Sequence, residues 1–155
     1  MFGEKINTPL RERRHWMSVL AKALWPDFEA VWRDCDFKVD YDILRKAETG
    51  LVMLQGRMGG SGAPFNFGEA TVTRCAVRLA SGEVGHAYVM GSHLQHAEFA
   101  AVCDGLMQSE DRSIITRAII EPLNRLRTAD NKNRSRKSTA TKVDFFTMVR
   151  GEDET

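Results

Sequence analysis

The spacing of hydrophobic residues predicts helices in the first third of the chain. Apolar residues three and four positions apart, including Trp16 and Leu20, predict a helix over residues 10–24. Pro26 ends this helix and can open a second one as its first residue. The apolar stripe of the second helix is Phe28, Val31, Trp32 and Cys35. Residues 34–42 are mixed and predict a turn, and a short helical turn over residues 41–46 follows.

The middle of the chain changes to the spacing of strands. The run L-V-M-L within residues 49–55 is continuously apolar and bounded by glycines, which is typical of a central strand. Over residues 71–79 the side chains alternate, so that Cys75 and Val77 share a face for a core while Arg74 and Arg78 point the other way. Residues 80–83 predict a hairpin turn, and residues 84–90 a returning strand.

The last third predicts helices again, followed by a polar segment. Ser92 and Gln95 have the spacing of a capping box, which predicts a helix over residues 93–108. Ser109 is the predicted N-cap of the next helix, which Pro122 kinks or divides. Residues 128–141 are polar and basic, and predict an exposed helix or a mobile loop. Residues 143–149 are apolar and predict a last strand or a docking segment.

Together these elements predict an α+β fold, with a small antiparallel sheet packed by several helices. We expect residues 1–127 to form the α+β domain and residues 128–142 a basic linker or exposed helix. Residues 143–155 would be a C-terminal strand or docking tail that belongs to this domain or to a partner. A chain of 155 residues is long enough to bury a core without disulfide or metal support.

A glycine-dense loop over residues 56–68 lies between the first two predicted strands. It holds Gly56, Gly59, Gly60, Gly62 and Gly68. Backbone N–H groups in such a loop can form an anion-binding nest. The alternative is a tight turn that fits against another backbone. Neither a Walker motif nor a G-x-G-x-x-G sequence that opens a helix is present.

Several side chains near this loop could carry chemistry, and each also has a structural interpretation. Glu69 beside Thr71, Thr73 and Arg74 could place an acid near two hydroxyls, or could pair with a cross-strand arginine. Cys75 shares the core face, which favours a buried structural thiol over a nucleophile. His86, His93 and His96 could hold a metal ion, and a free-standing metal enzyme is therefore one alternative function.

The charge of the chain is unevenly distributed. Its net charge is +1, whereas residues 125–142 carry seven basic residues and one acidic residue. A nucleic-acid-binding module is a second alternative, but this segment contains no aromatic residue, which favours an acidic partner or solvent. Cys35, Cys75 and Cys103 form no C-x-x-C pair, and neither a secretory signal nor a membrane-spanning run is present. We expect a cytoplasmic protein.

Five stretches of the sequence resemble the PhnG family, the small subunit of the bacterial carbon–phosphorus lyase system that degrades phosphonates. They are R-x-x-W-M-S-V-L-A-K-A (13–23), G-G-S-G-A-P-F-N-F-G-E-A-T-V-T-R-C (59–75), G-H-A-Y-V-M-G (85–91), H-A-E-F-A-A-V-C-D-G-L-M-Q (96–108) and T-K-V-D-F-F-T-M-V-R-G-E (141–152). The chain departs from the family pattern at Phe67, at Ser92 with His93, and at Gly105. The change at Ser92 and His93 weakens any role built on His93.

The resemblance implies a function at the level of a complex. PhnG works with PhnH, PhnI and PhnL to displace adenine from MgATP with a phosphonate, and joins PhnH, PhnI and PhnJ in a core complex. The nucleosidase chemistry is associated with PhnI, and the radical cleavage with PhnJ and its iron–sulfur cluster. The resemblance implies no catalytic residue, metal or cofactor bound by this chain itself. Candidate contacts with substrate or a partner are Arg57, Gly59, Gly60, Gly62, Asn66, Glu69, Thr71, Thr73, Arg74, His86 and His96.

Overall fold

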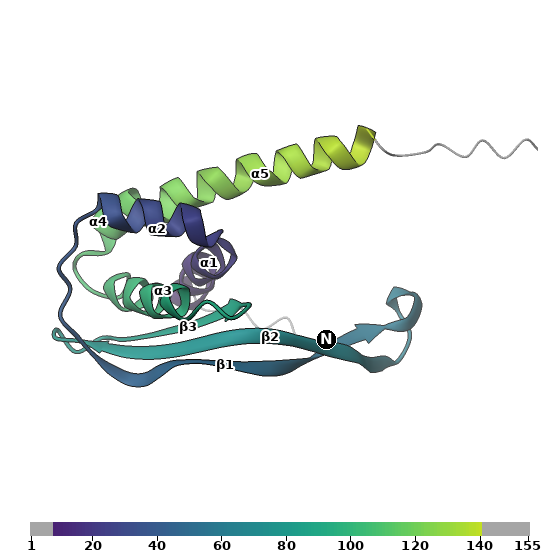
Figure 1. Ribbon diagram of the computed structural model, residues 1–155, viewed down its shortest axis with the longest axis horizontal. Helices are drawn as coiled ribbons and strands as arrows, with labels where there is room; N and C mark the ends of the chain where they lie inside the picture. The colour runs from purple at the N-terminus through teal and green to yellow at the C-terminus, as the bar shows by residue number, and fades with distance from the viewer. Residues whose placement is uncertain (1–7, 141–155) are drawn as a thin grey trace, which may run out of the picture.

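The computed structural model describes residues 8–140, and its architecture is a three-stranded antiparallel sheet with helices on one face (Figure 1). The strands are β1 (Tyr41–Arg57), β2 (Pro64–Leu79) and β3 (Val84–Met90), in the order β1-β2-β3. The helices are α1 (Thr8–Lys22), α2 (Trp25–Asp34), α3 (Leu94–Leu106), α4 (Arg112–Ile115) and α5 (Glu121–Ala140). The predicted α+β class is confirmed.

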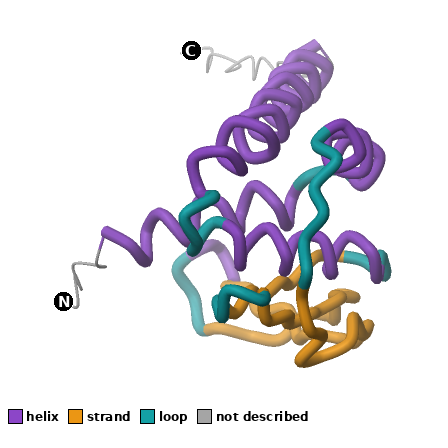
Figure 2. The backbone as a smooth tube through the Cα atoms, turned by 90° about the vertical axis from the view of Figure 1, so that its left-hand side faces the viewer, coloured by secondary structure: helices purple, strands orange, loops and turns teal. Residues whose placement is uncertain are grey.

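Within residues 8–140 the helices lie on one side of the sheet, and the other side, called the bare face below, has no helix on it (Figure 2). Helix α3 packs directly on β2 and β3, and α1 lies beside it. The predicted apolar stripes supply the core between these layers, since Trp16 and Leu20 of α1 and Phe28 of α2 are all buried. The sequence therefore predicted both N-terminal helices and the faces that they bury.

Alternation along β2 produces the two faces that the sequence predicted. Cys75, Val77 and Leu79 are buried against the helices, whereas Arg74 and Arg78 are exposed on the bare face. Helix α3 can approach closely because its contact residues are small. A Cβ atom at Gly85 of β3 would lie 1.9 Å from the carbonyl oxygen of Ala101 in α3. Glycine is required at position 85 for this packing distance.

The observed strand β1 shows that two predictions were wrong. Residues 41–46 form its beginning rather than a helical turn. Register shifts on either side of Arg45 insert extra residues into β1, and these bulges remove the alternation that would have identified a strand. L-V-M-L is not in a central strand either, because β1 is at the edge of the sheet and its Leu51 is 65% exposed.

The starts of the C-terminal helices also differ from the prediction. The N-cap of α3 is His93, which makes no capping hydrogen bond, and Ser92 lies outside the helix. Gly91 just before it has a φ of 95°, so the chain turns sharply after β3. The N-cap of α4 is Asp111, and Ser109 instead accepts a hydrogen bond from the Asp111 backbone N–H.

Pro122 neither kinks nor divides the helical segment, because it sits in the first turn of α5. A π-helical turn over Thr116–Ile120 precedes it and joins α4 to α5. Proline has no N–H to donate to the carbonyl four residues earlier, which belongs to Ala118. The thiol of Cys35, the C-cap residue of α2, lies 3.7 Å from that carbonyl oxygen, but its shorter hydrogen bond, at 3.0 Å, is to the carbonyl oxygen of Val31.

The basic segment continues α5 as helix through Ala140. The predicted C-terminal strand over residues 143–149 lies outside the described residues and stays a prediction. None of the helices within residues 8–140 is long and apolar enough to cross a membrane.

Candidate functional site: the projecting hairpin

The outer part of the β1–β2 hairpin extends beyond helices α1, α2 and α3 and forms the most distinctive surface of the described residues (Figure 1). Strand β3 pairs only with residues 72–78 of β2, and Val72 is the last paired position. Residues 50–71, called the hairpin arm below, therefore form a two-stranded ribbon beyond the three-stranded sheet. At the opposite end, the hydroxyl of Tyr41 donates a 2.7 Å hydrogen bond to Glu98 and anchors the hairpin to α3.

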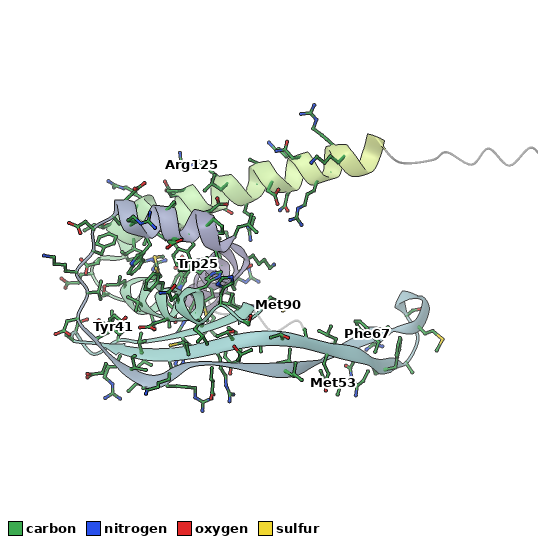
Figure 3. All side chains as sticks on the ribbon, in the orientation of Figure 1. Trp25, Tyr41, Met53, Phe67, Met90 and Arg125 are labelled. Atoms are coloured by element: carbon green, nitrogen blue, oxygen red, sulfur yellow. The ribbon has the colours of Figure 1, made fainter. Side chains whose placement is uncertain are left out.

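The hairpin arm exposes large apolar side chains on both faces. Leu51 and Met53 share one face through their pairing with Thr71 and Glu69. Leu51 is 65% and Met53 is 57% exposed. Figure 3 shows Met53 and Phe67 on the arm, past the helical layer that contains Trp25.

The second face carries Val52 and, nearer the tip, a pair of phenylalanines. The rings of Phe65 and Phe67 lie 6.2 Å apart, and a Cβ atom at Gly56 would be 3.1 Å from the Phe67 ring. Gly56 thus leaves room for the aromatic ring to lie across the backbone of β1. Phe67 is 60% exposed, so this pair is only partly covered by the arm itself.

A tight turn closes the tip of the arm. Gly59 and Gly60 have φ angles of 58° and 81°, which other residues rarely adopt. The N–H of Gly62 donates to the carbonyl oxygen of Met58, and the guanidinium of Arg57 donates to the carbonyl oxygen of Gly62 at 3.2 Å. These contacts favour the tight-turn interpretation of the glycine loop over the anion nest.

The predicted contact residues separate into the arm and the body of the protein. Seven of them lie on the arm: Arg57, Gly59, Gly60, Gly62, Asn66, Glu69 and Thr71. Thr73 is buried, where it donates to the carbonyl oxygen of Gly91 at 2.7 Å and meets the hydroxyl of Thr49 at 3.1 Å. This geometry gives Thr73 a structural task at the root of the arm.

Arg74 is the middle member of a polar row, Glu48–Arg74–Tyr88, that crosses the three strands on the bare face of the sheet. Its Nε donates to Glu48 on β1 at 2.8 Å, and Tyr88 is its register partner on β3. Hydrogen bonds with Tyr88 and then with Glu48 raise the pKa of Arg74 above its usual value. Glu69 does not make the predicted cross-strand ion pair: it is opposite Met53 and has no basic partner among residues 8–140.

The three histidines do not converge. His86 is exposed on β3, in a strand where Gly85 and Ala87 face the helices, whereas His96 is buried in α3. The Nε2 atom of His96 lies 2.8 Å from the carbonyl oxygen of Leu20, and burial lowers its pKa. No cluster of three potential metal ligands occurs within residues 8–140. The geometric basis of the metal-enzyme alternative is therefore absent there.

His86 lies in a groove between α1 and the edge strand β3. The groove has a volume of about 340 Å³, and Arg14 and Lys22 of α1 also line it. Cys75, the register partner of Ala87 in this groove, adds no nucleophile, since it is buried and its Sγ donates to the carbonyl oxygen of Arg45. Burial raises the pKa of Cys75, which favours the neutral thiol predicted from the sequence.

Asp104 is the polar residue that sequence reasoning missed. Its carboxylate is completely buried and accepts hydrogen bonds from Trp16 Nε1 at 2.8 Å, Arg13 Nη2 at 2.7 Å and the His86 backbone N–H at 2.9 Å. It thereby joins α1, α3 and β3. The available signal was an acidic residue within the apolar second half of an alanine-rich helix, together with Arg13 and Trp16 on one face of α1.

Helix α5, which carries the basic residues, extends toward the same end of the molecule as the hairpin arm (Figure 1). Two of them have partners within the helix, since Arg134 pairs with Asp130 at 2.9 Å and Arg127 donates to Asn124. Nothing in this geometry selects nucleic acid over solvent or an acidic partner, and nucleic-acid binding stays an alternative prediction.

The fold and the arm define a small α+β domain with a large uncovered apolar projection, a form expected of an accessory subunit. Residues 11–151 match the family described as "Phosphonate metabolism protein PhnG". The chain therefore belongs to the PhnG family, as its resemblance predicted. It is 43% identical over 142 residues to the alpha-D-ribose 1-methylphosphonate 5-triphosphate synthase subunit PhnG of Rhizobium meliloti (strain 1021), covering 92% of this chain and 91% of that protein.

Proposed function

We propose that this chain is a subunit of a synthase that transfers ribose 5-triphosphate from MgATP to a phosphonate. The observation that carries the proposal is the 43% identity to a synthase subunit along nearly the full length of both chains. In the reaction, a phosphonate oxygen bonds to C1 of the ribose while the C1–N9 bond to adenine breaks. Adenine leaves with a proton, and the triphosphate stays on the 5′ oxygen.

Within this assembly the chain acts as a non-catalytic subunit that shapes the transfer site. Two polar side chains with well-defined hydrogen bonds support this role. Asp104 joins three elements and Thr73 fixes the root of the arm, so both serve the fold. We further propose that its partners are subunits of the PhnI, PhnH, PhnJ and PhnL types. MgATP would be a substrate of the complex, with no cofactor bound by this chain, in the cytoplasm.

Reconstitution of the transfer reaction tests this proposal. The PhnI-type subunit, with PhnH- and PhnL-type subunits, is incubated with MgATP and methylphosphonate in the presence or absence of this chain. Adenine release is measured by chromatography, and the ribose 1-phosphonate product by ³¹P NMR. We expect the chain to shift the products from hydrolysed ATP to the phosphonate ester. An unchanged product ratio would overturn the proposal.

A further inference from the structure

The hairpin arm needs a particular kind of partner because both of its faces expose large apolar side chains. Leu51 and Met53 are exposed on one face, and Phe67 on the other. A partner with a flat surface could cover one face only. Burying both requires two apolar walls, one on each side of the ribbon. A second copy of the arm packed face to face would likewise leave the other face of each arm in water.

Among residues 8–140, both edges of the arm are also open. The outer edge of β1 has no neighbouring strand in this part of the chain, because β1 is at the end of the sheet order. On the other side, β3 ends at the pairing of Met90 with Val72, so residues 64–70 of β2 lack a second neighbouring strand. Unpaired strand edges offer backbone N–H and C=O groups to a strand of another chain.

The charge of the arm limits the chemistry of its partner. Only Arg57 and Glu69 are charged within residues 50–71, so the arm carries no net charge. The Arg57 guanidinium is engaged with the carbonyl oxygen of Gly62 inside the turn. An acidic protein surface or a polyanion would therefore gain little from the arm, whereas an apolar cleft with a polar or basic group opposite Glu69 would match it.

We propose that the hairpin arm inserts into an apolar cleft of another synthase subunit, where both faces are buried and at least one edge pairs with a strand. The identity of the partner as a synthase subunit rests on the proposed function. The cleft geometry rests on the arm alone. Insertion explains why the chain keeps a long apolar ribbon outside its own core, which would otherwise be a site of aggregation.

Single substitutions on each face provide the test. The full chain is co-expressed with tagged PhnI-, PhnH- and PhnJ-type subunits, and the amount retained on the affinity resin is measured. We expect Leu51→Ser and Phe67→Ser each to weaken retention at least about tenfold, since each removes apolar area from one wall of the cleft. Leu10→Ser and Ile114→Ser are the controls, because these residues are 56% and 52% exposed on the helices. They should retain association within about twofold.

The outcomes separate the inference from the proposed function. If the unsubstituted chain is not retained, both are overturned. If it is retained and neither arm variant weakens binding, the inference alone is overturned. An effect of Leu51→Ser without an effect of Phe67→Ser, or the reverse, indicates one-sided docking and overturns cleft insertion. Light scattering of the isolated chain completes the test, since a dimer that only the arm variants dissociate would identify a second copy as the occupant instead.

Discussion

The indole N–H of Trp16 in α1 donates a 2.8 Å hydrogen bond to the buried carboxylate of Asp104 in α3. Arg13, one turn earlier in α1, donates to the same carboxylate, so a single side chain fixes the position of α1 against the sheet-packing helix. Asp104→Asn should lower the free energy of unfolding by about 2–4 kcal/mol. The substitution removes the negative charge that pairs with Arg13. Because the Arg13 side chain is 30% exposed, water partly offsets the cost of leaving its charge unpaired.

Urea denaturation measures this change, and Glu12→Gln is the matched control. Glu12 pairs with Arg112 at 2.7 Å, but both side chains are about half exposed. Solvent screening makes such a pair worth less than about 1 kcal/mol. Equal effects of the two substitutions would show that the Asp104 cluster does not hold the helices together.

Gly85→Ala should be strongly destabilising. Its Cβ atom would lie 1.9 Å from the carbonyl oxygen of Ala101 and 2.6 Å from the backbone nitrogen of Gly105, so α3 would have to move away from β3. We expect a loss of about 2–3 kcal/mol, typical of overpacking in a core. Thermal denaturation measures it. Gly50→Ala has open space around its Cβ atom and should change stability by less than about 1 kcal/mol.

Two phenylalanines distinguish the core from the arm. Phe28 is 0% exposed and Phe67 is 60% exposed. Phe28→Ala should lower the free energy of unfolding by about 3–5 kcal/mol, because it removes a buried ring and leaves a cavity. Phe67→Ala should cost less than about 1 kcal/mol in the isolated chain. A large loss at Phe67 would mean that the chain itself covers the arm.

Stability should fall as the pH drops through the range of the histidines. Burial holds the pKa of His96 below its usual value of 6.5. The hydrogen bond with the carbonyl oxygen of Leu20 opposes this shift, and nearby His93 adds to it. The unfolded chain then binds a proton that the folded chain excludes. The contribution of neutral His96 to the free energy of unfolding is therefore fully present above pH 6.5. Below that pH the free energy of unfolding decreases, by up to about 1.4 kcal/mol per pH unit for one proton.

Chemical denaturation at a series of pH values from 7 to 5 measures this slope. His96→Gln should remove most of it, since glutamine can still donate to Leu20 but does not titrate. His15→Gln, at an exposed position of α1, should leave the slope unchanged. Identical pH profiles for the wild type and His96→Gln would contradict the assignment.

Local patterns predicted much of the fold and located the region of the candidate site. The stripe around Trp16 and Leu20 identified α1, and the alternation at Cys75 and Val77 identified both faces of β2. Residues 41–46 were misassigned because the bulges next to Arg45 interrupt their alternation. The importance of Asp104 was missed because its partners lie 91 and 88 residues away in the sequence, at Arg13 and Trp16.

The sequence by itself determined the periodic elements, the position of the tight glycine turn and the family. Only the tertiary structure decided which apolar strand residues are covered. Val77 and Leu51 are both strand residues with apolar neighbours, yet one is buried and the other is 65% exposed. The difference arises because α3 packs on the inner part of the hairpin and ends short of the arm (Figure 1). Burial depends on neighbours that are distant in the sequence, and the local spacing of apolar residues cannot predict which neighbours these are.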